Sequence, residues 1–205
     1  MPELPDIAVY LDCLAPRVLD QPIERFTVRN PFVLRSVNPT PAEIAGSRVE
    51  GLRRMGKRIV LVLERERFVV VHLMIAGRLR WLAADGKAPG KIVLAQFEFP
   101  RGVLVLTEAG NTRRASIHLV EGEAGLQSFE RGGLEVLDVA ADAFAARLVS
   151  ENHTLKRALT DPRLFSGIGN AYSDEILHRA RLSPLALTPK LAPAEVERLY
   201  LATRE

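Results

Sequence analysis

The sequence has little cysteine and no long apolar run, and each shortage argues against a class of protein. Cys13 is the only cysteine among 205 residues, so the chain forms no internal disulfide and no cysteine-rich zinc site. No stretch of about 18 or more uncharged apolar residues is present, which argues against a membrane span. Met1 is followed by Pro, Glu and Asp rather than by a basic and then an apolar segment, which argues against a secretory signal. We therefore expect a cytoplasmic protein with no membrane partner.

The sequence also has no large excess of basic or acidic side chains. The net charge is only +3, with 28 basic and 25 acidic side chains. The distribution is more informative, because residues 51–80 hold eight basic and two acidic side chains, a net charge of +6. Such a segment is typical either of a solvated strand face with basic turns or of a surface for a polyanion. Charge alone leaves both interpretations open.

Two short segments predict helices in the first part of the chain. Asp6 is a good N-cap residue, and apolar side chains follow it at helical spacing, which favours a helix over residues 6–16. A second helix is predicted at "TPAEIAG", where Thr40 and Glu43 form a capping box and Gly46 ends the helix. Both segments therefore carry their own start signals.

The rest of the chain divides into a β-like part and a helical part. Apolar runs separated by turn signals are "IERFTVRN", "RIVLVLE", "FVVVHLM", "KIVLAQFEF" and "VLVLTE". From residue 138 the pattern becomes helical, in "ADAFAARLVS", "ENHTLKRALT", "NAYSDEILHRA" and "PAEVERLYLATRE". We predict an α+β protein in which an antiparallel β-sandwich domain at residues 1–132 precedes an all-α domain at residues 133–205.

The amino terminus offers a nucleophile. The small side chain of Pro2 favours removal of Met1, which exposes a secondary amine, and a free α-amino group titrates at about 7.7–8. Attack of this amine on a sugar aldehyde carbon gives an iminium ion directly, and Glu3 is placed for proton transfer. The alternative is that "PELPD" only stiffens the approach to a helix. These residues alone do not decide between the two.

Two further motifs offer anion sites. In "LFSGIGNAYSDEIL", Gly167 and Gly169 permit a tight hairpin, and Asn170 begins the next helix. The free N–H groups there attract an anion, although Asn170 could also be a plain cap. In "GNTRRAS", Arg113 and Arg114 follow a strand, a placement that is also common for solvated arginines.

The order of the motifs is more specific than any one of them. Along the chain they are "PELPD", "RRMGKRIVLVL", "HLMIAGRLRW", "TRR" and "LKRALTDPRLFSGIGNAYSDEIL". This series resembles the formamidopyrimidine-DNA glycosylase and endonuclease VIII family of base-excision repair enzymes, from residue 2 to residue 185. The resemblance implies a β-sandwich with two flanking helices, a helix-two-turns-helix domain and DNA bound in a cleft between them.

The resemblance also implies roles for single residues. Pro2 matches the Schiff-base nucleophile, and Glu3 matches the residue that assists base loss and ring opening. The implied DNA contacts, most of them to phosphates, are Lys57, His72, Arg113, Arg114, Lys156 and Asn170. An enzyme that extrudes a nucleotide must clamp the backbone around it, so donors from both domains are expected to converge there.

The chain departs from the family motifs at the residues that fill the space of an everted base. Ile75 stands where the family has Met, and Met74 where it has Gly. Ala115 replaces the Phe wedge and Asn111 replaces an Asp, which leaves Ile75 and Arg113 as void-filling candidates. A wedge offsets an unstacking cost on the order of a few kcal/mol. The preferred lesion and the efficiency therefore do not follow from the sequence.

We predict a bifunctional glycosylase and abasic-site (AP) lyase that removes oxidised bases from double-stranded DNA and cleaves the abasic site by β,δ-elimination. It is expected to act as a monomer in the nucleoid, without a cofactor in this chain. The alternatives are a damaged- or abasic-DNA-binding protein with weak or no turnover, and a β-sandwich that binds a protein partner. The last helical pattern is still in phase at Glu205, so we expect the natural chain to continue, into the family's zinc finger.

Overall fold

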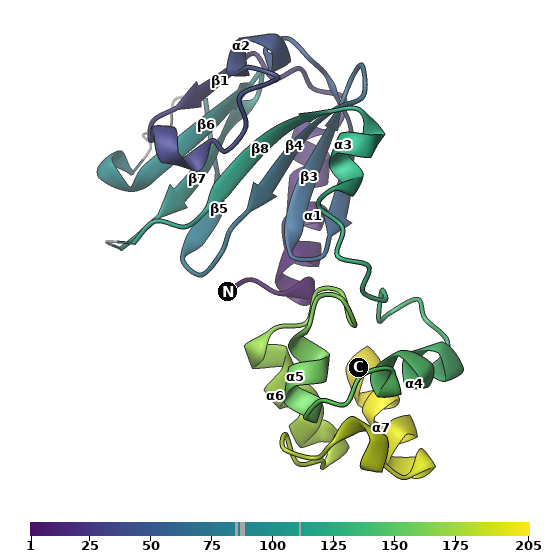
Figure 1. Ribbon diagram of the computed structural model, residues 1–205. Helices are drawn as coiled ribbons and strands as arrows, with labels where there is room; N and C mark the ends of the chain where they lie inside the picture. The colour runs from purple at the N-terminus through teal and green to yellow at the C-terminus, as the bar shows by residue number, and fades with distance from the viewer. Residues whose placement is uncertain (85, 87–88, 111) are drawn as a thin grey trace. The chain divides into compact units, whose positions relative to one another are not determined.

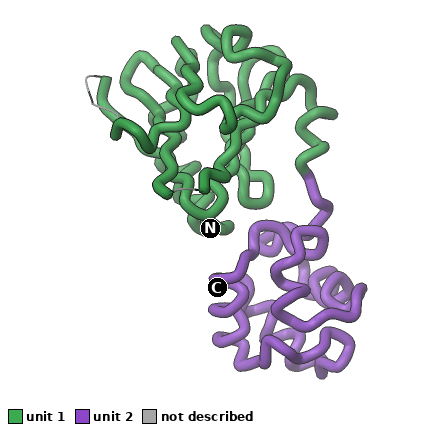
Figure 2. The backbone as a smooth tube through the Cα atoms, turned by 60° about the vertical axis from the view of Figure 1, so that its left-hand side comes forward, with its two compact units in different colours: residues 1–129 green, residues 130–205 purple. Residues whose placement is uncertain are grey.

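The computed structural model describes residues 1–84, 86, 89–110 and 112–205 and divides into two compact units (Figure 2). Unit 1 comprises residues 1–129, and unit 2 comprises residues 130–205. Unit 1 carries all of the named strands, and the named elements of unit 2 are helical. No helix in the described ranges is long and apolar enough to span a membrane.

Unit 1 is a sandwich of two antiparallel sheets (Figure 1). One sheet has the strand order β1-β6-β7-β5 and the other β2-β3-β4-β8. The strands span Arg25–Val28 (β1), Val49–Met55 (β2), Arg58–Leu63 (β3), Arg67–His72 (β4), Gly77–Leu82 (β5), Val93–Phe99 (β6), Gly102–Glu108 (β7) and Ser116–Glu121 (β8). The predicted antiparallel β-sandwich followed by a helical domain is confirmed.

The central strands are buried on both faces, which explains their unbroken apolar runs. On β3, Ile59 and Leu61 point into the main core that the two sheets share. Val60 points the other way, into a second cluster with Leu126 of helix α3 (Glu123–Gln127). Helix α3 therefore covers the outer face of this sheet, and a side chain on either face of β3 is removed from water.

Helix α1 (Leu4–Val18) begins earlier than predicted. The sequence pattern placed Asp6 at the N-cap, but Glu3 occupies that position and Asp6 is the third residue of the helix. Pro5 does not prevent the earlier start, because the N–H groups of the first turn have no partner within the helix and a proline loses nothing there. Helix α1 packs against β2 and β3.

Short helical turns join the strands at the rim of the sandwich. They are η1 (Pro31–Val33), α2 (Pro41–Ile44) and η2 (Gly90–Ile92). The capping box predicted for α2 is present, since the Thr40 N–H donates a hydrogen bond to Glu43 Oε2 at 2.7 Å. The side chain satisfies a backbone group that the short helix leaves open.

Unit 2 is a helical domain with an aromatic centre. Its main elements are α4 (Ala141–Val149), α5 (Leu155–Thr160), α6 (Asn170–Ala180), η3 (Thr188–Lys190) and α7 (Pro193–Arg204). The Phe144 ring lies 4.7 Å from that of Phe165 and 5.5 Å from that of Tyr200, centroid to centroid. Helix α6 packs against both α5 and α7.

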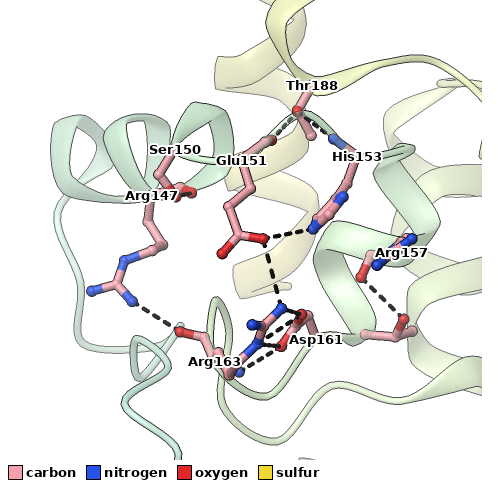
Figure 3. A network of polar contacts seen from close by, with 9 residues as sticks. Arg147, Ser150, Glu151, His153, Arg157, Asp161, Arg163 and Thr188 are labelled. Atoms are coloured by element: carbon pink, nitrogen blue, oxygen red, sulfur yellow. Dashed lines mark hydrogen bonds and ion pairs between the residues drawn. The ribbon is translucent and has the colours of Figure 1, made fainter.

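The second helix of unit 2 is shorter than the predicted segment, which began at Glu151. Helix α5 begins at Leu155 because Thr188 holds the residues before it in another conformation (Figure 3). The Thr188 hydroxyl donates a hydrogen bond to the Glu151 carbonyl oxygen at 2.7 Å and accepts one from the His153 N–H at 3.3 Å. These tertiary bonds outweigh the local helical pattern.

Candidate active site

Pro2 and Glu3 lie at the buried start of α1. Pro2 is buried, and Glu3 is only 2% exposed. The Glu3 N–H donates a hydrogen bond to Asp6 Oδ2 at 2.8 Å, which fixes the backbone directly after Pro2. Met1 precedes them and is 47% exposed. The peptide that joins Pro2 to Glu3 is therefore held in place, while the residue bonded to the Pro2 nitrogen is open to solvent.

Lys57 lies beside Glu3. It occupies the two-residue turn between β2 and β3, together with Gly56 at φ +60°. Burial lowers the pKa of the Lys57 ammonium group, and the Glu3 carboxylate opposes this effect. The interaction places an amine with a lowered pKa and a buried carboxylate within electrostatic reach of each other at the end of α1.

His72 ends β4, where it pairs with Arg58 of β3 and Ser116 of β8. Side chains at paired positions share a face of the sheet, so Arg58 lies next to the His72 ring. Burial lowers the pKa of His72 to about 4. Neighbouring groups that can carry positive charge act in the same direction: Arg58, Lys57 and His118. The ring is therefore neutral at pH 7 and surrounded by groups that attract an anion.

Arg58 extends this positive region across the outer face of the sheet, where it lies near the His118 ring. The His118 ring meets the Phe129 ring edge-on, with 4.9 Å between centroids, and the Arg58 guanidinium carbon lies 5.6 Å from the centre of the same ring. Burial lowers the pKa of His118, and the charges of Arg58 and Arg35 add to that effect. Sequence reasoning counted Arg58 only as part of a basic segment and missed His118, because strand pairing brings them together.

The turn between β4 and β5 presents Ile75 to solvent. Ile75 is 58% exposed, whereas Leu73 before it is buried. Met74, which stands at the family's Gly position, has φ +54°. That left-handed conformation costs a residue with a Cβ atom roughly 1–2 kcal/mol. The turn therefore keeps a backbone shape that suits glycine, and it projects an apolar side chain.

Glu108 anchors the loop that carries the two arginines. Glu108 is 1% exposed at the end of β7, and its Oε2 accepts hydrogen bonds from the N–H groups of Arg114 at 2.9 Å and Ala115 at 3.0 Å. Ala115 is itself only 3% exposed. A Cβ atom on Gly77 would lie 3.0 Å from the Ala115 Cβ, so this loop and the β4–β5 turn touch. Sequence reasoning missed Glu108, although a lone acid ending the apolar run "VLVLTE" was a usable signal.

The side chains of the two arginines are exposed. Arg113 donates a hydrogen bond from Nη2 to the Lys91 carbonyl oxygen at 2.9 Å, so it reaches toward η2. Arg114 lies two residues before Ser116, the partner of His72. The substituted position Asn111 lies outside the described residues.

In unit 2, the structure places Asn170 and Lys156 on neighbouring helices. Asn170 is exposed as the first residue of α6, and Gly169 is the N-cap. Asn170 therefore lies at the N-terminus of α6, beside the N–H groups of the first helical turn. Lys156 of α5 donates from Nζ to Asp174 Oδ1 of α6 at 2.5 Å.

A cluster near the start of α5 has the residue types of a metal site. Ligand atoms of Glu151, His153 and Asp161 lie within 4.8 Å of one another. Arg163 fills the position that a cation would need, with Nη2 2.6 Å from Asp161 Oδ2 and 3.6 Å from Glu151 Oε2 (Figure 3). Arg163 also lowers the pKa of Asp161 to about 2, mainly by hydrogen bonding. The cluster is a set of ion pairs that fastens the turn before α5.

Within unit 1, the structure gathers the predicted residues at one end of the sandwich. The start of α1, the β2–β3 turn and the β4–β5 turn lie at the same end (Figure 1). The residues collected there are Pro2, Glu3, Lys57, His72, Ile75 and Arg114. Lys156 and Asn170 form a separate pair of positions within unit 2.

Comparison with known proteins identifies the family. The model for the formamidopyrimidine-DNA glycosylase N-terminal domain matches residues 1–115, and the model for the H2TH domain of the same enzymes matches residues 134–205. The chain belongs to the formamidopyrimidine-DNA glycosylase family. A formamidopyrimidine-DNA glycosylase from Moorella thermoacetica is 36% identical over 216 residues, which cover 97% of this chain and 74% of the relative. One from Solibacter usitatus is 31% identical and covers 100% and 75%, respectively.

Solved structures of this glycosylase family share the fold. The Lactococcus lactis Fpg in complex with DNA containing an abasic site has a TM-score of 0.90 at 22% identity, over 98% of this chain and 76% of that one. MutM in complex with DNA containing carbocyclic 8-oxo-G has a TM-score of 0.90 at 22% identity, over 99% and 77%. Identity at this level shows a common fold, in agreement with the sandwich and the helical unit described above.

Proposed function

We propose that this member of a DNA glycosylase family removes oxidised bases from double-stranded DNA and then cleaves the abasic site. The observation that carries the proposal is the buried Pro2–Glu3 pair at the start of α1, within electrostatic reach of Lys57. We assign the chemistry to a catalytic domain at residues 1–132 and additional DNA binding to residues 133–205, acting together as a monomer on chromosomal DNA.

The proposed reaction requires a free amine at Pro2. After removal of Met1, the Pro2 nitrogen attacks C1′ of the damaged nucleotide, the bond from C1′ to the base breaks, and the base leaves with a proton. Glu3 transfers a proton to the sugar ring oxygen as the ring opens, which leaves an iminium ion between Pro2 and C1′. Loss of a C2′ proton expels the 3′ phosphate, and a second elimination expels the 5′ phosphate. None of these steps needs a metal ion or cofactor.

Phosphate contacts are assigned to residues of both units. In unit 1, Lys57, His72 and Arg114 lie at the end of the sandwich where Pro2 lies. In unit 2, Asn170 stands at the N-terminus of α6, where the helix dipole favours an anion, and Lys156 lies on α5. The lowered pKa of His72 supports this role, because burial and neighbouring positive charges keep the ring neutral, and a phosphate would offset those charges.

We assign the space left by the extruded nucleotide to Ile75 and Arg113. Both side chains are exposed on loops at the rim of the sandwich. Ala115 is buried and bonded through its N–H to Glu108, so it has neither the size nor the freedom of a wedge. This burial favours a second candidate function, a protein that binds damaged or abasic DNA and turns over slowly, because unstacking would then lack one of its usual aids.

Borohydride trapping separates the two functions. With Met1 removed, the chain should become covalently linked to duplex DNA that contains an abasic site, because borohydride reduces the iminium ion to a stable amine. The matched control is the same chain with Met1 retained, in which the Pro2 nitrogen is an amide and does not react. Binding without trapping by the processed chain would favour the damage-binding function, and trapping of the control would contradict the role of Pro2.

A further inference from the structure

Unit 1 has an open hollow of about 640 Å³, and of its described lining side chains Arg113 is the one to which the proposed function gives a role. It lies between the segment after β1, the η2 turn and strand β6, and the loop before β8 contributes one side chain. Lining residues that bear on its chemistry are Arg29, Asn30, Phe32, Lys91, Gln96 and Arg113. The volume is in the range of about 300–1,000 Å³ that small-molecule sites occupy.

An exposed aromatic ring stands in this hollow on a fixed backbone. Phe32 is 79% exposed, although a Phe side chain is usually buried. Its N–H donates a hydrogen bond to Asn30 Oδ1 at 3.1 Å. Just before it, the N–H groups of Arg29 and Asn30 both donate to the Leu94 carbonyl oxygen, at 2.8 and 3.0 Å. The ring is therefore presented to solvent by a hydrogen-bonded turn and offers a flat surface for stacking.

The cations around the ring have neutral partners. Arg29 donates from Nε to the Gln96 side-chain oxygen at 3.1 Å, and Arg113 donates to a backbone carbonyl. No carboxylate is among the described residues that line the hollow. Nearby on β1, Arg25 shows the usual alternative, with Nη2 2.7 Å from Glu98 Oε2. The hollow therefore keeps a positive charge that a phosphate would complement.

We propose that this hollow binds one unpaired nucleotide of the DNA, the one opposite the extruded base, with its base stacked on Phe32 and its phosphate facing Arg29. Arg113 at the edge of the hollow keeps the role assigned to it above. An aromatic face together with cations is the combination that holds single nucleotides, and it is tolerant of sequence because every base has a π-face. This inference rests on the proposed function, since only extrusion of a damaged nucleotide leaves its partner unpaired.

Arg113 connects the hollow to the proposed reaction. It belongs to the loop that Glu108 anchors, and the same loop touches the β4–β5 turn that presents Ile75. Residue 115 is a buried alanine, and the sequence of the loop, "AGNTRRA", contains no aromatic residue. Phe32 is an aromatic ring that lines the same hollow as Arg113. A base that has lost its partner can thus stack on the Phe32 ring and be partly shielded from water.

Photocrosslinking tests the assignment directly. The full chain, with Met1 removed, is bound to a duplex that carries a stable abasic-site analogue with 5-iodouracil opposite to it. Long-wavelength ultraviolet light joins this base to a stacked aromatic ring, and we expect the adduct in the peptide that contains Phe32. Phe32→Leu should abolish the adduct and weaken duplex binding about tenfold, because stacking on one aromatic ring is lost. Phe32→Tyr should keep both.

Matched controls are available in the same unit. Val37 is 85% exposed outside the hollow, so Val37→Ala should leave the crosslink and the affinity unchanged. For the charge, Arg29→Gln should weaken binding more than Arg101→Gln, since both arginines are exposed but only Arg29 lines the hollow. Equal losses in each pair, or an adduct on another peptide, would overturn the inference.

Two further outcomes separate the inference from the proposed function. Failure of borohydride trapping together with a Phe32 adduct would contradict the chemistry assigned to Pro2 but retain the nucleotide site. Successful trapping without an effect of Phe32→Leu would contradict the nucleotide site but retain the chemistry assigned to Pro2. Deoxyadenosine monophosphate is the probe for a free nucleotide: if it bound to the hollow as tightly as the duplex does, the site would belong to a soluble nucleotide and not to DNA.

Discussion

Charged groups gather in two regions, the end of the sandwich that holds Pro2 and the turn before α5. The two regions differ in the charges that surround their titratable groups. Around His72, burial together with neighbouring positive groups lowers the pKa of the ring to about 4. Around Asp161, Arg163 supplies the opposite charge, and the pKa of the carboxyl group falls to about 2. In the first cluster the Glu3 carboxylate acts on Lys57, while Lys57 and Arg58 both oppose protonation of the His72 ring. In the second cluster, Arg163 pairs directly with the carboxylates.

This difference separates groups that act on a ligand from groups that hold the fold. Ion pairs such as Arg163 with Asp161 complete each other, so binding a further ion would first have to break them. An anion bound near His72 would add a negative charge beside Lys57 and Arg58, whose positive charges oppose protonation of the ring.

The largest effect is expected from two matched glutamates. Glu3→Gln keeps the size of the side chain but removes its proton transfer, so base excision should slow by about 100-fold or more while the free energy of unfolding changes little. Glu151→Gln weakens the contacts to His153 and Arg163 and should lower the free energy of unfolding by about 0.5–1 kcal/mol, with excision unchanged. Single-turnover excision assays and urea denaturation measure the two quantities; a large stability loss in Glu3→Gln with excision intact would make Glu3 a structural cap.

A smaller effect is expected for DNA affinity. Lys57→Gln removes an ammonium group that we assign to a phosphate, so affinity should fall about tenfold for every DNA sequence and the salt dependence should lose about one unit of slope. Arg25→Gln is the matched control, because Arg25 already pairs with Glu98. Binding measured by fluorescence anisotropy across salt concentrations distinguishes them; an equal change of slope in both variants would contradict the contrast.

The smallest effect concerns stability against pH. The pKa of His72 is lower in the folded protein than its ordinary 6.5, so the unfolded chain takes up the proton first and folding loses stability as the pH falls from about 6.5 to about 4. His118 adds to the loss in this range. The lowered pKa of Asp161 stabilises the fold above its ordinary value of 3.8, and that contribution is lost only as the pH falls from 3.8 to about 2.

His72→Gln should therefore flatten the upper range by about 1 kcal/mol, allowing for solvent screening, and Asp161→Asn should flatten only the lower range. Trp81 lies on β5 and is the only tryptophan, so its fluorescence reports the unfolding of unit 1. Helical circular dichroism follows the whole chain. An unchanged upper range in His72→Gln would show that the cations near this ring do not act on it.

The sequence predicted the central strands and the edge strand β1, and it missed the other three edge strands. Each apolar run identified as a strand became one, but β2, β5 and β8 were not recognised. All three are edge strands. An edge strand has a solvated face, so in β5 the exposed Arg78 and Arg80 alternate with Leu79 and hide the pattern. The helix starts predicted at Asp6 and Glu151 were both wrong. Helix α1 begins earlier because its first turn tolerates Pro5, and α5 begins later because Thr188 bonds the residues before it.

At the candidate site, motifs were sufficient where the chain itself places the residues together. Pro2 and Glu3 are adjacent, and Asn170 follows the glycines that start its helix. Glu108, His118 and Phe32 were out of reach, since their surroundings come from strand pairing and from loops that meet only in the folded unit. Spacing along a sequence cannot report such contacts.

The most direct test of the account is the position of the covalent adduct on the protein. Lys57 is the natural competitor of Pro2, because it is an amine near Glu3 whose pKa burial lowers. After borohydride reduction on abasic DNA and digestion with trypsin, mass spectrometry should locate the sugar on the α-nitrogen of Pro2. An adduct on the Lys57 Nζ, or one that forms while Met1 is still attached, would contradict the role of the Pro2 amine as the nucleophile.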